Sequence, residues 1–563
     1  MSQILLVAGL QLGWLVASSS ARRPNVLIIQ PDDLPHYDPW HRPPNTPNDP
    51  DRRIPFPSAD GLPNLERLRN GGVELTQAYT TSAMCGTSRW STITGRYPSR
   101  ARSNEGDYVV IPRTKLEGRD CTAENIPQLF RDNGYRTSMF GKWHLSTIDY
   151  SKYTYEYVKS LLLGQVKECG FDHVSGLYAE NLWHDFNDGS FSHNMEWITH
   201  EAIQEMKRDS DEPWFMYYNP TVPHGAESVS RALTEFSCMA TPSGMLDSKP
   251  SVPGLTDDQS CWDYRQTIFE RADSDADVDL GAIWLDDAIG GLLRVLEDTG
   301  QLEDTVILFF EDHGMEPKSS LYEGGVRIPM FINYGSKLET GSKLDVPVST
   351  VDIGPTLLEY ADITPSYEMD GKSLKTALAH ISYSNSNPTW IERCLFFELN
   401  YDRAVRCGCY KYLQINDRDN SNTWEKGGKA GLSKRRRNLF DLCNGTTEYS
   451  PTTDTEAVSV DDERTANELD SMLTCHSNQV ESQDYGRVYD CQLPISSQAR
   501  PLPEPSHDDK LEQSQENVEV EGDEVASAGE PSLIVEAATV STDAAEEGAP
   551  GQDSKWTAEP SSP

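Results

Sequence analysis

The stretch PNVLIIQPDDL at residues 24–34 joins a continuous apolar run to two adjacent carboxylates. An apolar run without alternation is typical of a strand that is buried on both faces of a parallel sheet. Strands are predicted in this way at 25–30, 73–79, 136–140, 214–219, 305–310, 328–333 and 345–348. Helices are predicted between them at 63–70, 88–94, 123–132, 268–298 and 352–360. Strands that alternate with helices predict an α/β fold with a large, mostly parallel central sheet flanked by helices.

The pattern changes near residue 384. Three runs at 394–399, 403–405 and 410–415 follow one another closely and predict antiparallel strands. We therefore expect a smaller C-terminal subdomain that contains an antiparallel sheet. The predicted organisation is a signal peptide at 1–21, a main α/β domain at 22–383, a C-terminal subdomain at 384–495 and an acidic disordered tail at 496–563.

The charge of the chain is strongly negative and unevenly spread. The 563 residues include 89 Asp and Glu against 49 Lys and Arg, which gives a net charge of −40. This balance argues against a nucleic-acid-binding protein, which needs a basic surface. Residues 501–563 contain 16 acidic residues, two lysines and a single aromatic residue, Trp556. Such a segment cannot bury enough apolar surface to offset its chain entropy, and we predict that it is disordered.

The N-terminus has the pattern of a targeting signal. An apolar run at 4–17 is followed by small residues at 18–21, which favours cleavage after Ala21. The run is short for a membrane span, although an uncleaved signal anchor is the alternative because no Lys or Arg precedes it. A glycosylation sequon at 444–446 agrees with secretion. We expect the protein in the secretory pathway, extracellular or in a lysosome-like compartment, and not at a membrane after cleavage.

Acidic residues stand at the ends of two predicted strands. Asp32 and Asp33 follow the first strand, and EDHG at 311–314 follows the strand at 305–310. In an open α/β sheet the ligand site lies beyond the carboxyl ends of the strands. Adjacent carboxylates repel each other unless a cation or a proton lies between them. Either cluster alone is commonly a turn or a helix cap, but the two together favour a site for Ca²⁺ or Mg²⁺.

The segment CGTSRWSTITGR at 85–96 places a cysteine at the start of a predicted helix. The positive end of the helix dipole favours an anion there, and Arg89 stands one turn further along. A buried structural cysteine is the alternative interpretation. The chain has 11 cysteines, and removing Cys85 from this number leaves an even set for disulfide bonds.

The combined motifs resemble those of the type I sulfatases, a formylglycine-dependent family of the alkaline phosphatase superfamily. The matching segments are PNVLIIQPDDL at 24–34, CGTSRWSTITGRYPSR at 85–100, GKWHL at 141–145, TVPHG at 221–225, EDHG at 311–314, KSSLYEGGVRIP at 318–329, VDIGPTLL at 351–358 and RAVRCGCYKY at 403–412. Each motif alone is weak, but their joint order over residues 24–445 is specific. The resemblance implies an alkaline phosphatase-like fold, with 22–383 as the catalytic domain, and hydrolysis of a sulfate ester on a carbohydrate or aryl substrate.

The resemblance also implies two cofactors. Cys85 would be oxidised by a formylglycine-generating enzyme, so that formylglycine becomes a built-in cofactor. One divalent cation per chain, Ca²⁺ rather than Mg²⁺, would be the second. The metal-binding set that the resemblance implies is Asp32, Asp33, Cys85, Asp312 and His313.

The matching positions give the remaining site residues their implied roles. Arg89 would orient the aldehyde hydrate, and Lys142 and Lys318 would contact the sulfate oxygens. His144 would act as a base when sulfate leaves, and His224 would assist departure of the substrate alcohol. The full catalytic set implied is Cys85, Arg89, Lys142, His144, His224 and Lys318.

One position departs from the family pattern. The family motif reads Cys-x-Pro-x-Arg, or carries Ala at the third position, whereas Thr87 stands there in this chain. A catalytically inactive sulfatase-like binding protein is therefore one alternative. A phosphoesterase of the same superfamily is another, although it would use a Ser or Thr nucleophile and usually two metals.

The expected partner is a sulfated small molecule or polysaccharide. The basic run at 434–437 is predicted to be a solvated loop, with a processing site or a glycan-binding patch as alternatives.

Overall fold

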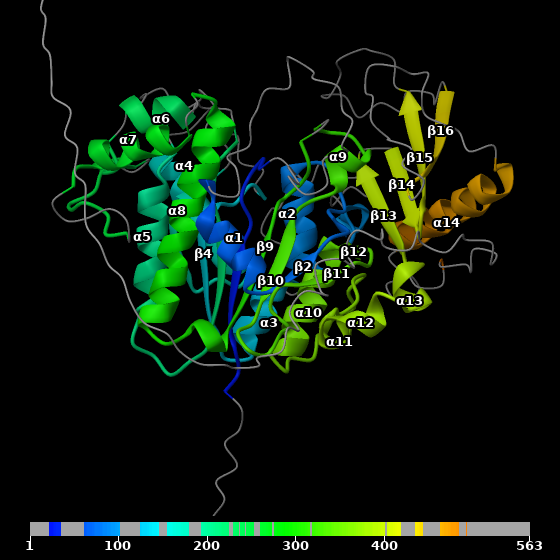
Figure 1. Cartoon of the computed structure of the whole chain (residues 1–563), viewed down its shortest axis with the longest axis horizontal. Coiled ribbons are helices and arrows are strands. Elements are labelled where there is room, and N and C mark those ends of the chain that lie inside the picture. Colours follow the sequence, from blue (N-terminus) through cyan, green and yellow to red (C-terminus); the bar gives the residue numbers. More distant parts are fainter. Residues whose placement is uncertain are drawn as a thin grey trace, which may run out of the picture. The chain divides into compact units, whose positions relative to one another are not determined.

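The computed structural model describes most of the chain between residues 22 and 491 (Figure 1). The described residues are 22–34, 61–101, 124–145, 155–179, 193–224, 229–235, 237–241, 244–252, 259–272, 275–315, 318–399, 402–417, 434–442, 462–482 and 491. All of them belong to one compact unit, which extends to Leu502. The predicted signal peptide, the sequon and the acidic tail lie outside the described residues. The domain boundaries therefore stay predictions.

An eight-stranded sheet forms the centre of this unit. Its strands, in spatial order, are β11 (Ser342–Leu344), β2 (Val73–Leu75), β10 (Met330–Asn333), β9 (Thr305–Phe310), β1 (Asn25–Ile29), β6 (Trp214–Asn219), β4 (Arg136–Lys142) and β5 (His173–Tyr178). Neighbouring strands pair in parallel, except that β10 is antiparallel to both β9 and β2. The prediction of a large, mostly parallel central sheet is confirmed.

Strand β1 lies in the middle of the sheet, between β9 and β6, and both of its faces are apolar. Val26 and Ile28 pack into one hydrophobic cluster, and Leu27 and Ile29 pack into a second cluster on the opposite face. All four side chains are at most 3% exposed. Each buried side chain of this size contributes roughly 1.5–3 kcal/mol. A strand with two apolar faces requires cover on both faces of the sheet, and the two clusters provide it.

Helices cover both faces of the sheet. One face carries α1 (Pro63–Asn70), α5 (Met195–Met206), α6 (Val229–Glu235), α7 (Cys261–Ala272) and α8 (Asp277–Asp298). The other face carries α2 (Cys85–Thr94), α3 (Ile126–Asp132), α4 (Tyr155–Glu168), α10 (Ile353–Tyr360), α11 (Lys375–Ala379), α12 (Ile381–Ser384) and α13 (Pro388–Ile391). Figure 1 shows α5 and α8 side by side along one side of the sheet.

A second sheet follows in the C-terminal part. Its antiparallel strands are, in order, β13 (Cys394–Leu399), β14 (Asp402–Cys407), β15 (Tyr410–Asp417) and β16 (Lys434–Asp441). Helix α14 (Glu463–Ser482) packs on one face of this sheet, and the other face packs against residues of the main domain that include Tyr79 and Val326. The predicted antiparallel sheet is confirmed. Two further two-stranded sheets pair β12 (Val348–Ser349) with β3 (Ala78–Tyr79) and β7 (Ala240–Thr241) with β8 (Gly244–Met245).

Two predicted strands are wrong in extent because the chain changes sheet within them. The strand predicted at 73–79 is divided between β2, which pairs with β10 and β11, and β3, which pairs with β12. Of the strand predicted at 345–348, only Val348 is in a strand, β12, and residues 345–347 connect β11 to β12. A local apolar pattern does not encode which sheet a residue joins.

Two other predictions of local structure are also wrong. The helix predicted at 268–298 is two helices, because α7 ends at Ala272 and α8 begins at Asp277. The intervening sequence contains Asp and Ser, whose side chains compete with helical hydrogen bonds. The basic run at 434–437 begins strand β16 and is not a loop, since it pairs with 414–417 of β15.

Disulfide bonds stabilise several parts of the fold, as predicted. The pairs are Cys238–Cys261, Cys394–Cys407 and Cys475–Cys491, and Cys169 and Cys409 are also disulfide-bonded. Within the described part of the chain, Cys85 is the only free cysteine. None of the described helices has the length and apolar character needed to cross a membrane.

Candidate active site

The candidate active site lies at the carboxyl ends of the central parallel strands. Asp32 and Asp33 follow β1, while Asp312 and His313 follow β9. Strands β1 and β9 are parallel neighbours in register, with Ile29 opposite Phe309. The two acidic strand ends identified in the sequence are therefore adjacent in space.

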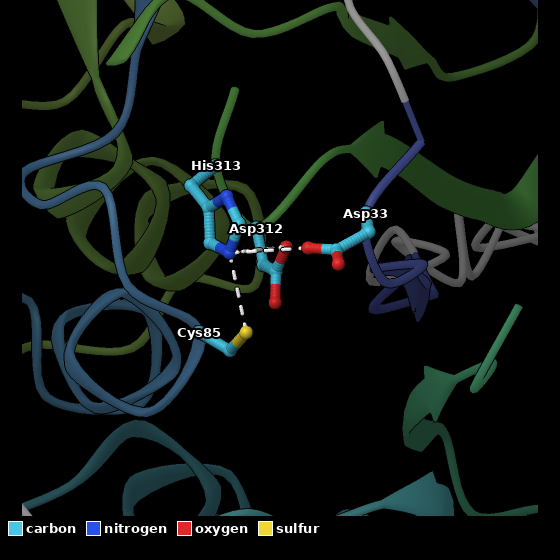
Figure 2. A group of neighbouring side chains, drawn as sticks. All are labelled: Asp33, Cys85, Asp312 and His313. Atoms are coloured by element: carbon cyan, nitrogen blue, oxygen red, sulfur yellow. Dashed lines mark hydrogen bonds and ion pairs between the residues drawn. The ribbon is translucent and has the colours of Figure 1, made fainter. Parts of the chain in front are cut away.

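Four side chains converge on one point (Figure 2). Ligand atoms of Asp33, Cys85, Asp312 and His313 all lie within 4.8 Å of one another, and all four residues are buried. His313 Nε2 is 3.2 Å from Cys85 Sγ and 3.3 Å from Asp33 Oδ1. These residues come from β1, β9 and the start of α2, so only the tertiary fold brings them together.

Cys85 is the first residue of α2. Met84, immediately before it, is extended, and the amide of Ser88 donates to the Met84 carbonyl at 2.9 Å, which begins the helix. Cys85 is 5% exposed. Burial raises the pKa of the Cys85 thiol well above its usual range. The charge of Lys142 lowers this pKa by less, and the charge of Asp312 raises it further. The structure places this cysteine in the site and not in a disulfide.

Arg89 lies one turn along α2 and is completely buried. Its Nη2 donates to the Pro31 carbonyl at 3.0 Å and forms ion pairs with Asp312 at 3.1 Å and Asp32 at 3.5 Å. The guanidinium thus joins both acidic strand ends. Burial of a charge without partners is costly, so these contacts fix the position of Arg89.

Lys142 ends β4 and contacts Asp32, its Nζ lying 2.6 Å from Oδ2. Burial raises the pKa of Asp32, but the charges of Lys142, His224 and Arg89 outweigh burial and lower it well below its usual range. Gly141 allows this approach: its φ is 90°, and a Cβ there would lie 1.9 Å from the Asn219 carbonyl oxygen. Only glycine fits this position.

His224 and Lys318 meet at Asp33. Lys318 Nζ donates to the two Asp33 oxygens at 2.8 and 2.5 Å, and His224 Nε2 lies 3.2 Å from Oδ2. Lys318 Nζ and His224 Nε2 are themselves 3.3 Å apart. Burial lowers the pKa of His224, which favours its neutral form. With 12% and 32% of their side chains exposed, His224 and Lys318 are the more accessible members of the site.

His144 lies beside the start of α2. Its φ is 54°, its amide donates to the Ala179 carbonyl at 2.9 Å, and its carbonyl oxygen would be 3.1 Å from a Cβ on Gly86. All the site residues predicted from the sequence are thus in the described structure, at or next to one strand-end region. Their individual roles stay predictions.

Glu311 was not among the site residues predicted from the sequence, although it is part of the EDHG motif. Glu311 is fully buried, and neither of its carboxylate oxygens has a hydrogen-bond partner among the described residues. Burial and the charge of Asp312 raise its pKa well above the usual range. The signal in the sequence that could have identified Glu311 is its position directly before two predicted metal ligands.

The donor set fits a divalent cation. Within the described residues, Asp312 Oδ1 is buried and has no hydrogen-bond partner. A buried carboxylate oxygen without a partner is unfavourable, and the nearby carboxylate and imidazole groups are suitable ligands for a metal ion. The observation agrees with a cation site formed by Asp33, Asp312 and His313. Asp32 is next to this site, because Arg89 forms ion pairs with both Asp32 and Asp312.

The fold and the acidic strand ends define an α/β protein of the alkaline phosphatase-like class. A family model described as Sulfatase matches residues 25–363, which is more than half of the chain. A second model, described as N-sulphoglucosamine sulphohydrolase, C-terminal, matches residues 311–419. The chain therefore belongs to the sulfatase family, and the predicted type I sulfatase resemblance is confirmed.

Known proteins similar to this chain agree with that assignment. An uncharacterized sulfatase of Escherichia coli is 28% identical over 393 residues, which cover 61% of this chain and 63% of that protein. An N-acetylglucosamine-6-O-sulfatase of Bacteroides thetaiotaomicron is 24% identical, over 68% of this chain and 81% of that protein. A solved structure of a protein in complex with its substrate, D-glucosamine-2-N,6-O-disulfate, has a TM-score of 0.52 and 18% identity, covering 82% of this chain and 99% of that chain. This last similarity concerns the fold alone.

Proposed function

We propose that the protein is a sulfuric ester hydrolase whose nucleophile is made from Cys85. The observation that carries this proposal is the position of Cys85, a buried free cysteine at a helix start with Sγ 3.2 Å from His313. Ligand atoms of Asp33 and Asp312 lie at the same point. A structural cysteine would not need to lie among carboxylate, imidazole and guanidinium groups.

The proposed cofactors are formylglycine at position 85 and one divalent cation, Ca²⁺ rather than Mg²⁺. The cation would be held by Asp32, Asp33, Asp312 and His313 together with residue 85, and when bound it would act as a Lewis acid. The hydrated aldehyde would supply two hydroxyl groups on one carbon, one to attack sulfur and one to allow release of sulfate. The residues described below bind and orient the ester in this scheme.

The cationic side chains form the sulfate-binding part of the site. The charges of Lys142, Lys318 and Arg89 all act on Cys85, and these side chains would compensate charge on the sulfuryl oxygens. Arg89 is held by Asp32 and Asp312, so its guanidinium has little freedom to move. The net charge of −40 would repel a sulfate ester at long range, and these local cations must therefore provide the attraction.

Proton transfer is assigned to the two histidines. His224 is partly exposed and lies 3.3 Å from Lys318, and its protonated form would donate a proton to the departing substrate alcohol. His144 lies beside the first turn of α2 and would take the proton from residue 85 when sulfate leaves.

The substrate class is a carbohydrate or aryl sulfate, and the named N-acetylglucosamine-6-O-sulfatase relative supports the carbohydrate. Maturation requires a formylglycine-generating enzyme in the secretory pathway.

The test is sulfate release by the full chain, purified after secretion. An aryl sulfate, a sulfated monosaccharide and a sulfated polysaccharide serve as substrates, with a phosphate monoester for comparison. Cys85→Ala should reduce sulfate release by at least about 10³-fold. Ser91→Ala is the matched control, because Ser91 lies in the same buried helix and its hydroxyl accepts from Thr81 outside the site.

Two outcomes would refute the proposal. Release of phosphate but not sulfate would favour the phosphoesterase alternative. Absence of any hydrolysis, with Cys85 unmodified, would favour the inactive binding protein that Thr87 first suggested.

A further inference from the structure

A buried ion pair joins the C-terminal sheet to the main domain. Lys411 of β15 is completely buried, and its Nζ donates to Glu323 Oε1 at 2.9 Å. The other carboxylate oxygen of Glu323 accepts a hydrogen bond from the Tyr79 hydroxyl at 2.7 Å. Both oxygens of one carboxylate are therefore held, one by each part of the molecule.

The charges around Glu323 are arranged to keep it ionised. Burial raises the pKa of Glu323, but Lys411, Arg406 and Arg327 outweigh burial and lower it to about 2. Arg406 also lies over the Tyr79 ring, with its guanidinium carbon 5.0 Å from the ring centre. Lys411 has no exposure to water, so loss of Glu323 or Lys411 would leave the other charge without its main partner.

Glu323 is the first residue of α9 (Glu323–Val326), and α9 is attached directly to the metal-ligand turn. The amide of Gly314, next to His313, donates to the Gly325 carbonyl at 3.0 Å. The contact is so close that a Cβ on Gly314 would lie 2.1 Å from the Gly324 carbonyl oxygen. A shift of α9 would therefore displace the turn that carries Asp312 and His313.

The same helix is connected to two other parts of the site. The amide of Thr80 donates to the Val326 carbonyl at 2.8 Å, and the segment that begins at Thr80 leads to Cys85. On the other side, the segment from Lys318 leads into α9, and Tyr322 within it packs edge-on against Phe440 of the C-terminal sheet at 6.2 Å. Thus α9 contacts the chain segments that present the nucleophile, the metal ligands and Lys318.

We propose that Lys411 is a positioning residue for the active site, and that through Glu323 it fixes α9 against the metal-ligand turn. The C-terminal sheet would then be part of the catalytic apparatus in function, although Lys411 does not touch substrate. This inference rests on the proposed sulfatase activity. It predicts that the site loses its geometry when the ion pair is broken, even where the fold is retained.

The first test compares substitutions at Lys411 with a matched break elsewhere. Lys411→Met should lower kcat/KM for an aryl sulfate by about 10–100-fold, the range found when groups that orient metal ligands are lost. Lys411→Arg, which keeps the charge, should recover most of this loss. Arg393→Met is the control, because Arg393 and Asp352 form another buried pair at 2.6 Å that does not involve α9.

A second variant protects the test against misfolding. The double variant Lys411→Met with Glu323→Gln removes both charges of the pair, and it should be more stable than Lys411→Met alone. Its kcat/KM should nevertheless stay below that of the wild type, because the connection to α9 is still absent. An equal loss of activity in Arg393→Met and Lys411→Met, measured on folded protein, would overturn the inference.

Hydrogen exchange separates this inference from the proposed function. Lys411→Met should increase amide exchange in 314–328 by at least about tenfold relative to the wild type, while Arg393→Met should not. If the wild type hydrolyses no sulfate ester but this exchange pattern is found, the proposed function fails and the positioning by Lys411 stands. If the wild type is active and exchange in 314–328 is unchanged in Lys411→Met, the positioning role is refuted.

Discussion

Replacing Glu398 by Gln should make the free energy of unfolding less dependent on pH in the acidic range. Glu398 lies in β13 and is 3% exposed. One carboxylate oxygen is 2.9 Å from His476 Nε2 of α14, and the other accepts from the Ser99 amide at 2.6 Å. His476 is stacked on Phe396 with ring centres 4.1 Å apart. One carboxylate therefore connects α14, the C-terminal sheet and the main domain.

The size of the effect follows from the pKa of Glu398. Burial raises this pKa, but the contacts of His476, Arg403 and Ser99 outweigh burial and lower it from 4.5 to about 2. The folded state thus binds the proton less tightly than the unfolded state. The contribution of ionised Glu398 to the free energy of unfolding is fully present above the pKa of the unfolded state. It is lost as the pH falls through the pKa of the folded state, about 2. By linkage it amounts to about 3 kcal/mol at pH 6 and about 1 kcal/mol at pH 3.

The assay is urea denaturation of wild type and Glu398→Gln at pH 6, 5, 4 and 3, with disulfides intact. The difference in unfolding free energy should stay constant from pH 6 to pH 5 and shrink by about 2 kcal/mol by pH 3. Glu339→Gln at an exposed position controls for loss of a carboxylate alone. A difference that stays constant down to pH 3, or that grows in acid, would refute this reasoning.

Three further predictions concern the site and the tail. Asp312→Ala should reduce the bound divalent cation from about one per chain to near zero and abolish sulfate release, as measured by elemental analysis and activity; full metal occupancy would contradict the site. Thr87→Pro should raise the fraction of formylglycine at position 85, seen as a peptide about 18 Da lighter, because Pro fits the first turn of a helix and favours the extended form before folding; an unchanged or lower fraction would contradict this. Truncation after Arg500 should leave activity and Tm nearly unchanged, and a large fall in either would show that the acidic tail contributes to the fold.

The sequence is most informative where a short apolar run has clear boundaries. The strands predicted at 214–219, 305–310 and 394–399 and the helix predicted at 63–70 have the observed bounds. Each is bordered by Pro, Gly or charged residues, so the local pattern suffices. The convergence of Asp33 and Asp312 was also predictable, because parallel strands present their carboxyl ends at the same edge of a sheet.

Features that depend on distant contacts were not predictable from local patterns. Helix α14 and strand β5 were not predicted, since their positions are determined by packing against sheets formed from other parts of the chain. The burial of Glu311 and the buried partner of Lys411 were equally hidden. A lysine within YKY at 410–412 has the local pattern of a strand residue, and only the tertiary structure shows that it meets Glu323, 88 positions earlier.

The central position of β1 has a consequence for the time course of biosynthesis. Strand β1 requires β9 as a neighbour, and residue 310 is synthesised roughly 225 residues after Cys85. At about 5–20 residues per second this takes about 10–45 s. Until then, the sheet against which α2 packs is incomplete, and the segment around Cys85 is not enclosed. The conversion proposed for Cys85 must precede completion of this sheet, because the folded protein buries the thiol. Slower translation or slower folding would then prolong the period in which Cys85 is accessible for conversion.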